Sequence, residues 1–404
     1  MNRSLSILVT CGLALSLTAC HGNGKYTAEQ ANAAKDKLGQ LKSGLEFQTA
    51  MGDFLAGDFG KANAAVDRSI ALNDKVARTW VLKGRIQLET GNLEGALVAL
   101  SKAETLDAKS VDAQYFLGLV NERLERKDEA LKRFQAAADL DRANPQYAIA
   151  AAETLIDLGR RDEAKAYLEG RGAQLANNAA LRQTLGHIAM MDEKPDKAAE
   201  LFNEARLLAP NDNGILEDLV RAQVIVGRFA DAEVNLQKLV KDPVLAKRRD
   251  LLLMRARCLT QIERIVDARE ILIKLCNDTT GSADIESWND LGHVSYLLND
   301  LSRVRQASAK LIAIAPKLPE GYVLRAMWEQ KRGDARAAKD SVTKAISLKQ
   351  SPDSYLLLAT IQQELKDTDG ARSALANALK LNPNNNTAKQ LLDQLNNFAT
   401  VTPQ

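Results

Sequence analysis

Alanine recurs along this chain at a nearly constant spacing, and this spacing limits the folds that the chain can adopt. The first five intervals are all 34 residues, and Val304 replaces alanine at one position of the series. The alanines are Ala62, Ala96, Ala130, Ala164, Ala198, Ala232, Ala268, Ala338 and Ala371. A period of this length is typical of helix-turn-helix solenoids, in which each unit buries its apolar face only against its neighbours. The sequence therefore predicts an all-α solenoid.

Other residue types fall into register when this alanine is placed at position 20 of a 34-residue unit. The units then begin at residues 43, 77, 111, 145, 179, 213, 249, 285, 319 and 352. Glycine at position 8 predicts that the two helices of a unit cross closely, with the alanine as the facing small residue. These glycines are Gly84, Gly118, Gly186 and Gly292. Glycine at position 15 predicts a left-handed residue where the first helix stops. These glycines are Gly57, Gly91, Gly159, Gly227 and Gly333. Position 24 is large and mostly apolar, with Ser308 as the exception, and predicts a filled seam between units.

Proline tests this register independently, because a proline inside a helix costs about 3 kcal/mol. All eight prolines of the array fall at an expected turn or in a first helical turn. They are Pro145, Pro195, Pro210, Pro243, Pro316, Pro319, Pro352 and Pro383. The proline positions therefore support the register.

The pattern resembles that of the tetratricopeptide repeat family. The residues that carry the resemblance include Trp80 or Trp288 at position 4, followed in the second case by Leu291 and Gly292. The resemblance covers residues 43–385 and implies a right-handed solenoid of about ten units. Members of this family bind peptides, protein domains or polymers on the same scaffold, so the resemblance specifies the fold more closely than the function.

The array departs from regularity at its ends and at three turns. The spacing stretches to 36 residues around Pro243 and around Gly281 and shrinks to 33 near Pro352. Residues 27–42 begin with a capping-box pattern and predict an N-terminal capping helix. Residues 386–404 predict a polar C-terminal capping helix and a short tail, since an array must cover its exposed end.

The first twenty residues predict export and lipid attachment. A basic residue, a short apolar run and small residues read as a signal peptide over residues 1–19. The ending Leu17-Thr18-Ala19-Cys20 resembles the lipobox of bacterial lipoproteins, which implies acylation of Cys20 and a tether over residues 20–26. An ordinary signal peptide with a chance cysteine is the alternative. In such families an aspartate after the cysteine retains the protein in the inner membrane. His21 stands there instead, which implies an outer-membrane protein that faces the periplasm.

The remaining composition limits the chemistry of the chain. The net charge of +2 favours neither nucleic acid nor an anionic membrane surface as a partner. With three histidines and no HExxH, GxSxG or phosphate-loop motif, we expect no enzyme, no cofactor and no metal site. Cys258 and Cys276 occupy positions 10 and 28 of one unit, too far apart for a disulfide, and we expect buried free thiols.

Helix spacing puts positions 2, 5, 9, 12 and 13 of each unit on one stripe, which lines the groove in the family that the chain resembles. The candidate partner-binding residues on this stripe are Arg85, His187, Met191, Arg221, Ile225, Arg257, His293, Tyr296 and Leu297. Such a cationic and apolar strip would suit an acidic, partly apolar protein. In the alternative interpretation, Arg221 and Arg257 pair with carboxylates such as Glu217 and Asp250, and the histidines are ordinary polar residues. No unit pairs lysine at position 5 with asparagine at position 9, so the carboxylate clamp of chaperone-binding relatives is not expected.

Two functional classes follow. The first is a lipid-anchored periplasmic scaffold that binds protein partners of an envelope assembly. Its resemblance to known lipoproteins favours exopolysaccharide export, with protein secretion or pilus assembly as the alternative. The second is direct binding of an anionic polysaccharide in the groove, which an aromatic content of 4% does not favour.

Overall fold

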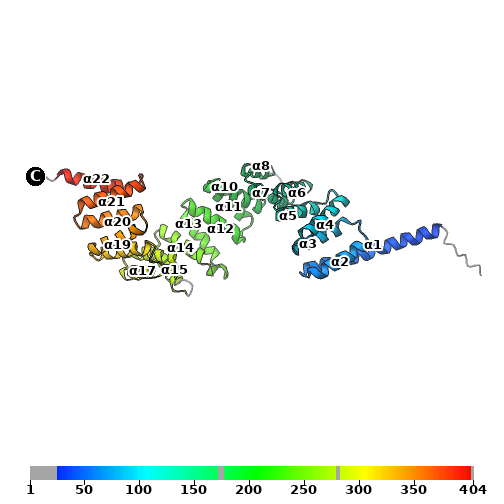
Figure 1. The fold of residues 1–404 in the computed structure, drawn as a ribbon, viewed down its shortest axis with the longest axis horizontal. Helices are drawn as coiled ribbons and strands as arrows, with labels where there is room; N and C mark the ends of the chain where they lie inside the picture. The colour runs from blue at the N-terminus through cyan, green and yellow to red at the C-terminus, as the bar shows by residue number, and fades with distance from the viewer. Residues whose placement is uncertain (1–24, 172–176, 279–282, 402–404) are drawn as a thin grey trace, which may run out of the picture. The chain divides into compact units, whose positions relative to one another are not determined.

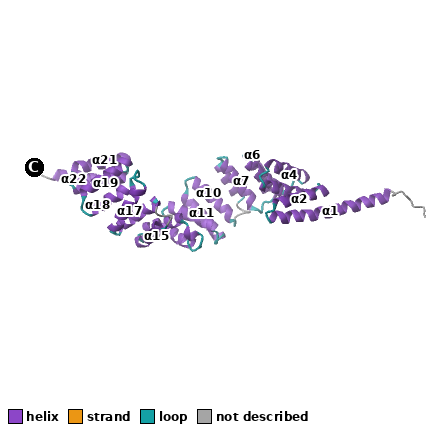
Figure 2. Ribbon diagram, turned by 60° about the horizontal axis from the view of Figure 1, so that its bottom comes forward, coloured by secondary structure: helices purple, strands orange, loops and turns teal. Residues whose placement is uncertain are grey.

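The computed structural model describes residues 25–171, 177–278 and 283–401, and the regular structure in these ranges is helical (Figures 1 and 2). The chain divides into two compact units, with the boundary after residue 176. Unit 1 contains the following helices: α1 Lys25–Leu55, α2 Phe59–Leu72, α3 Ala77–Glu89, α4 Leu93–Leu106, α5 Val111–Arg123, α6 Lys127–Leu140, α7 Pro145–Asp157 and α8 Arg161–Gly170.

Unit 2 continues the same alternation of short antiparallel helices. It contains α10 Ala179–Met191, α11 Pro195–Leu208, α12 Asn213–Ile225, α13 Phe229–Leu239, the 3₁₀ turn η1 Leu245–Lys247, α14 Arg249–Gln261, α15 Ile265–Asn277, α16 Ile285–Leu297, α17 Leu301–Ile314, α18 Glu320–Lys331, α19 Ala335–Leu348, α20 Pro352–Glu364, α21 Thr368–Leu381 and α22 Asn386–Val401. Within the described ranges of this unit, no helix is both long enough and apolar enough to cross a bilayer, and the same holds for unit 1.

The helix boundaries confirm the register. From the second to the tenth repeat, each first helix begins within one residue of the predicted unit start. Every proline of the array occupies a helix start or a turn. The alanine at position 20, or Val304 in its place, has no exposed surface in any of the ten repeats. The chain is therefore an α-solenoid built from helix-turn-helix repeats, as predicted.

The ends of the array differ in detail from the prediction. The capping helix expected over 27–42 and the first helix of the first repeat form one helix, α1, which starts at Lys25 inside the expected tether. No proline or left-handed residue interrupts it, and glycine inside a helix costs only about 1 kcal/mol. At the other end, α22 covers the predicted closing segment up to Val401. The segment 1–19 and Cys20 lie outside the described residues, as does Gly281.

The turn inside every repeat contains a left-handed residue at position 15. The five glycines predicted there have φ between 75° and 81°. The other five repeats hold the same conformation without glycine, at Glu125, Glu193, Glu263, Asn299 and Lys366, with φ between 56° and 61°. The backbone of the turn is therefore imposed by the packing of the two helices, whether or not the local residue favours it.

The glycines at position 8 face a different partner from the one predicted. A Cβ added to Gly118 would lie 2.5 Å from the Phe134 ring, and one added to Gly186 would lie 2.5 Å from Phe202. Each phenylalanine occupies position 24 of the repeat that contains its glycine. The large residue of the second helix, and not the alanine at position 20, therefore packs over the glycine. At Gly118 and Gly186, the residue at position 24 therefore packs against the first helix of its own repeat. The sequence pattern had instead predicted that position 24 fills the seam between repeats.

In the repeat with serine at position 24, a residue of the following repeat fills the space over the glycine. Ser308 is too short to cover Gly292, and Leu324 of the following first helix, which is fully buried, occupies that space. The close approach at Gly292 is thus a contact between repeats, in contrast with the contacts at Gly118 and Gly186.

The two described cysteines are free and buried, as predicted. Burial raises the pKa of the Cys258 thiol to about 11 and that of the Cys276 thiol to about 12. Both side chains therefore behave as small apolar residues in the core of unit 2.

Candidate binding groove

The nine predicted groove residues divide between the two units. Arg85 lies on α3 in unit 1. The other eight lie on first helices of successive repeats in unit 2: α10 carries His187 and Met191, α12 carries Arg221 and Ile225, α14 carries Arg257, and α16 carries His293, Tyr296 and Leu297. Unit 2 therefore presents most of the predicted stripe, and Arg85 belongs to a separate body.

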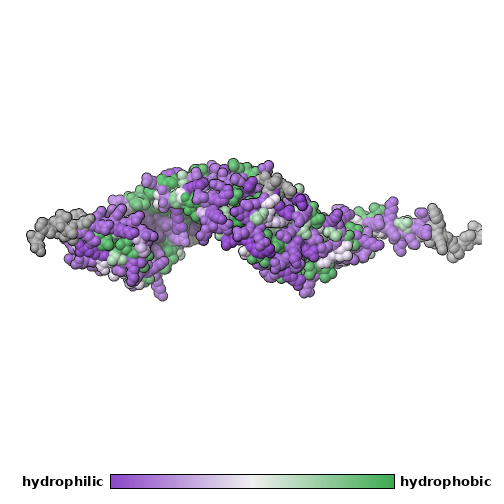
Figure 3. Space-filling model, turned by 90° about the horizontal axis from the view of Figure 1, so that it is seen from above, coloured by the Kyte–Doolittle hydropathy of each residue, from purple (hydrophilic) through white to green (hydrophobic). Residues whose placement is uncertain are grey.

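Apolar side chains are exposed at position 13 of α10, α12 and α16, near the end of each helix, whereas α14 has Gln261 at this position. Met191, Ile225 and Leu297 are 48%, 60% and 62% exposed. Figure 3 shows one face of the molecule, on which apolar residues gather in patches among hydrophilic ones. Exposed apolar side chains at a repeated position are a feature of protein-binding surfaces, because a partner can cover them together.

The two predicted arginines in unit 2 are ion-paired. Arg221 lies 3.5 Å from Glu217 and 3.3 Å from Asp218. Arg257 lies 2.6 Å from Asp290 and 2.9 Å from Glu286, both on α16.

The expectation that Arg257 pairs with Asp250 was wrong, because Asp250 pairs with Arg248 instead. Arg257, at position 9, reaches positions 2 and 6 of the following repeat, and a search along its own helix misses these partners. The stripe is therefore not a row of free cations.

His187 is also held by a carboxylate. Its Nε2 lies 3.0 Å from Asp218 Oδ2, and Gln183 donates a hydrogen bond of 2.8 Å to the same oxygen. Burial alone would raise the pKa of Asp218, but the hydrogen bonds from His187 and Gln183 outweigh it and lower that pKa. Asp218 is therefore ionised at neutral pH and neutralises this part of the stripe.

Arg85 has aromatic neighbours in unit 1. Its guanidinium lies 4.8 Å from the centre of the Phe54 ring and 4.9 Å from that of Phe116. Cation–π contacts of this kind hold the side chain between the first helices of adjacent repeats. Arg85 therefore takes part in packing between repeats.

A cavity of about 530 Å³ opens between the first helices α16, α18 and α20 of unit 2. Two predicted residues, His293 and Tyr296, line it, together with Met327 and Leu357. Burial lowers the pKa of His293, so its imidazole is neutral at neutral pH. The Lys331 ammonium lies 5.3 Å from the centre of the Tyr296 ring, and burial raises the pKa of the Tyr296 hydroxyl. The predicted stripe thus becomes concave at its C-terminal end.

Two further residues of this cavity were not singled out from the sequence. Asn289 is at position 5 of its repeat and Glu320 is at position 2 of the next, both on the predicted stripe. Asn289 Oδ1 and Glu320 Oε2 are buried, and within the described part of the chain no group donates a hydrogen bond to either. Their positions could have been read from the register, but their lack of a donor could not.

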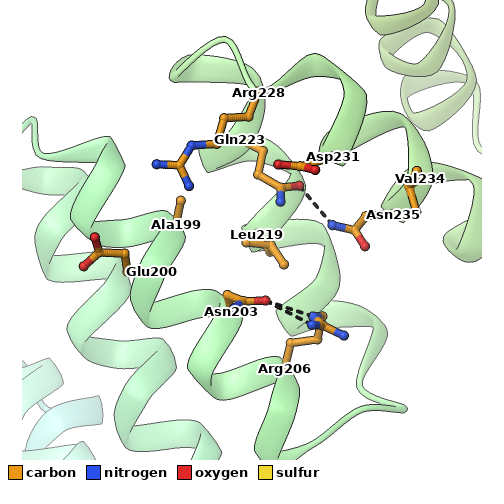
Figure 4. Close-up of a pocket in the computed structure, with 10 residues that line it drawn as sticks. All are labelled: Ala199, Glu200, Asn203, Arg206, Leu219, Gln223, Arg228, Asp231, Val234 and Asn235. Atoms are coloured by element: carbon orange, nitrogen blue, oxygen red, sulfur yellow. Dashed lines mark hydrogen bonds between the residues drawn. The ribbon is translucent and has the colours of Figure 1, made fainter.

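A second cavity, of about 380 Å³, lies against the second helices α11 and α13 (Figure 4). Its polar side chains bond to one another or to near neighbours. Asn235 donates to Gln223 at 3.0 Å, and Arg206 donates to Asn203 at 3.0 Å. Arg228 pairs with Asp196 at 3.1 Å. Because Asn203, Arg206, Gln223, Arg228 and Asn235 already have partners, these side chains have little unmet capacity for a ligand.

Comparison with known proteins identifies the class to which the chain belongs. Family models described as "Tetratricopeptide repeat" match residues 54–110, 99–148 and 352–385. These parts of the chain are tetratricopeptide repeats. No curated protein sequence matches it.

Solved structures of the same architecture are similar at low identity. YrrB, described as a TPR protein with an unusual peptide-binding site, is 20% identical with a TM-score of 0.37, over 48% of this chain and 98% of that one. PilF of Pseudomonas aeruginosa is 20% identical with a TM-score of 0.42, over 53% and 96%. A tetratricopeptide repeat protein from Parabacteroides merdae is 12% identical with a TM-score of 0.42, over 80% and 99%.

Proposed function

We propose that this scaffold for protein–protein interactions is lipid-anchored at the periplasmic face of the outer membrane and holds together an envelope assembly, in the first instance one for exopolysaccharide export. The scaffold role follows from the repeats. The anchor and its location are supported by the basic and apolar start of the chain, by the Leu-Thr-Ala-Cys ending at Cys20 and by His21 after it. A protein secretion or pilus assembly system is the alternative, since the same anchor and array would serve it.

The observation that carries the binding role is the set of exposed apolar side chains at position 13 of three first helices in unit 2. Met191, Ile225 and Leu297 repeat at the same place on α10, α12 and α16. The two arginines of the stripe in unit 2, Arg221 and Arg257, are ion-paired, so a partner covering this surface would meet apolar contacts without having to neutralise these two charges.

The tryptophans favour a protein partner over a polysaccharide. Trp288 is 6% exposed, and Trp80 donates its indole N–H to the Asp74 carbonyl at 2.7 Å. The Trp328 ring lies under the guanidinium groups of Arg305 and Arg332, at 5.7 and 4.9 Å from its centre. Sugar-binding grooves rely on open ring faces, and these three rings are buried or in contact with other groups.

The anchor can be tested by metabolic labelling with an alkyne fatty acid. The wild-type chain should take up the label and fractionate with the outer membrane. Cys20→Ala should lose the label and accumulate as an uncleaved precursor, whereas Cys11→Ala should behave as the wild type. An unlabelled wild-type chain would remove the anchor and the location assigned from it.

The scaffold surface can be tested by a photo-crosslinking residue placed at Ile225 or Leu297 in living cells. Val266, on the second helix α15 and 49% exposed, is the matched control. Mass spectrometry should identify specific envelope proteins at the two groove positions and not at the control. Export proteins among them support the narrower proposal, and secretin or pilin proteins support the alternative. The same products at all three positions would mean that the groove is not the binding surface.

A further inference from the structure

The first repeat leaves one face of its first helix uncovered. Position 3 is buried in each of the nine following repeats. The residues there are Thr79, Ala113, Tyr147, Leu181, Ile215, Leu251, Ser287, Gly321 and Ser354. The preceding repeat supplies the cover, as at Gly321, where an added Cβ would meet Ile312 and Leu311 of α17. Position 3 of the first repeat is Leu45, which is 69% exposed. The open end of the array is therefore an exposed face of α1.

The segment predicted to cap this end does not cover it, because it continues α1 as one helix instead of folding back (Figure 1). Its neighbour α2 ends at Leu72, whose carbonyl oxygen would lie 3.6 Å from a Cβ added to Gly39. Before that point, every side chain from residue 29 to residue 38 is exposed. A helical segment that lacks packing has little stability of its own, so a surface that covers it would stabilise it.

The exposed side of α1 is apolar along its centre. Leu38, Leu41 and Leu45, the leucine stripe, are spaced by three and four residues and therefore share one face of the helix. They are 52%, 64% and 69% exposed. The opposite face packs on α2 through Ser43, whose Oγ donates a hydrogen bond of 2.9 Å to the Ser69 carbonyl. The leucine stripe therefore faces away from α2.

Lysines border the leucine stripe on both sides. Lys35 and Lys42 follow one edge and Lys37 follows the other, and together they are the flanking lysines. All three are exposed. The acidic residues Glu29 and Asp36 lie on the opposite face of the helix. The exposed face of α1 is therefore apolar with a positive border.

This pattern fits an anionic phospholipid surface better than a second copy of the chain. Helices that lie in a membrane interface bury leucines at the boundary of headgroups and acyl chains, and lysines at their edges extend toward the phosphates. Two copies paired through this face would bring the flanking lysines of each toward those of the other, and like charges at such edge positions oppose pairing. Glu46, four residues after Lys42, already pairs with Arg68 of α2 at 2.9 Å and offsets little of this repulsion.

The length of chain before α1 also favours a membrane. Once the proposed signal peptide is removed, residues 20–24 precede Lys25, and these five residues span at most about 18 Å. Acylation of Cys20 would hold the start of α1 within that distance of the bilayer. The same five residues are too few to cover the leucine stripe themselves. The net charge of +2 does not decide the question, because an anionic surface acts on cations within a Debye length of ~10 Å.

We propose that α1 lies along an anionic phospholipid surface, with the leucine stripe in the boundary between headgroups and acyl chains and the flanking lysines against lipid phosphates. This inference rests on the proposed anchor at Cys20 and adds a second contact between the chain and the membrane. The lipid surface then supplies the cover that a folded-back cap would have supplied.

The inference can be tested with the mature acylated chain in liposomes, labelled at one engineered cysteine with the environment-sensitive dye NBD. Ala34→Cys places the dye on the side of the leucine stripe, and Asn32→Cys places it on the opposite side; both positions are exposed. The native Cys258 and Cys276 are buried and do not compete for the dye. In liposomes that contain phosphatidylglycerol, the emission at residue 34 should shift to the blue and be quenched by nitroxides on the lipid chains, and the emission at residue 32 should do neither. Equal behaviour at the two positions would overturn the inference.

Variants assign the effect to the named side chains. Leu38→Gln/Leu45→Gln should abolish the shift at residue 34, whereas Val98→Gln, at a 69% exposed position of α4, should preserve it. Each flanking lysine changed to glutamine should lower the ratio of docked to undocked helix about fivefold. Lys102→Gln, at an exposed lysine of α4, should leave that ratio unchanged. All these side chains are exposed, so circular dichroism spectra and melting temperatures should match the wild type. A shift that survives the leucine double variant would contradict the inference.

The outcomes separate this inference from the proposed function. Excimer emission from pyrene at residue 34 in the absence of lipid would show that a second copy covers the face, and would overturn the inference. An acylated chain in which residue 34 stays in water would retain the anchor and reject the docked helix. A chain that is not acylated, but whose residue 34 enters added liposomes, would retain the docked helix and reject the anchor.

Discussion

Replacing Gly118 by alanine should destabilise the chain, although alanine is the better helix former. The added Cβ would lie 2.5 Å from two carbons of the Phe134 ring, about 1 Å closer than the usual contact of ~3.5 Å between carbon atoms. Phe134 is 1% exposed, so the ring has little room to withdraw. Overpacking of this kind costs about 1–3 kcal/mol, while the change from glycine to alanine inside a helix gains about 1 kcal/mol. We therefore expect a net loss of up to about 2 kcal/mol.

Gly52→Ala is the matched control in the same unit. Gly52 is exposed on α1, and a Cβ there would meet nothing within 4 Å, so the same substitution should stabilise the chain by about 1 kcal/mol. Urea unfolding monitored by circular dichroism gives the sign, and amide hydrogen exchange locates the change, because repeat arrays need not unfold in two states.

The double variant Gly118→Ala/Phe134→Leu tests the cause of the loss. It reproduces the pair found in the fourth repeat, where Ala152 accompanies Leu168. The double variant should be more stable than the sum of the single effects predicts. If Gly118→Ala stabilised the chain as much as Gly52→Ala, the close-approach argument would be refuted.

Three further predictions follow from the same structure. Glu193→Gly should raise the free energy of unfolding by about 1 kcal/mol, because Glu193 holds φ at 58°, a conformation that glycine adopts more easily. Gly159→Ala, at φ 75°, should lower it by a similar amount. Urea unfolding midpoints measure both changes, and midpoints that shift in the same direction would contradict the reasoning. Cys258 and Cys276, with their pKa raised to about 11 and about 12, should resist alkylation at pH 8 until the chain is unfolded, and mass spectrometry of their peptides would reveal rapid native labelling if this is wrong. Burial lowers the pKa of His293 below 6.5, so protonation of this imidazole disfavours the folded state. The contribution of the neutral imidazole to the free energy of unfolding should be complete above pH 6.5 and be lost as the pH falls through the folded-state pKa. Hydrogen exchange in α16 at pH 7.5 and 5.5, corrected for the intrinsic rate, should show this loss in the wild type and not in His293→Gln.

The repeat register could be read from the sequence because it depends on small residues in fixed places. A solenoid repeats the same local packing, so each unit supplies independent evidence for the position of its helices. The alanine at position 20 and the prolines at turns placed the helix starts to within one residue from the second repeat onward. What the pattern could not supply was the identity of facing residues, such as Phe134 over Gly118 and Leu324 over Gly292.

The candidate site was predictable only as a stripe. The register placed His293 and Tyr296 on the surface that forms a cavity. It could not show that Arg257 reaches Glu286 and Asp290 on α16, because residues 29 and 33 positions apart meet only after neighbouring repeats stack. Nor could it single out Glu320, whose distinguishing property is the lack of a donor.

The order of the amino acids alone determined that the chain folds into stacked helix pairs, since the steric demands of glycine, alanine and proline act within a single repeat. Which charges neutralise one another, and which oxygens stay without a donor, was decided by the tertiary structure. Both properties depend on side chains of two or three repeats brought within hydrogen-bonding distance, and a 34-residue period does not fix those distances.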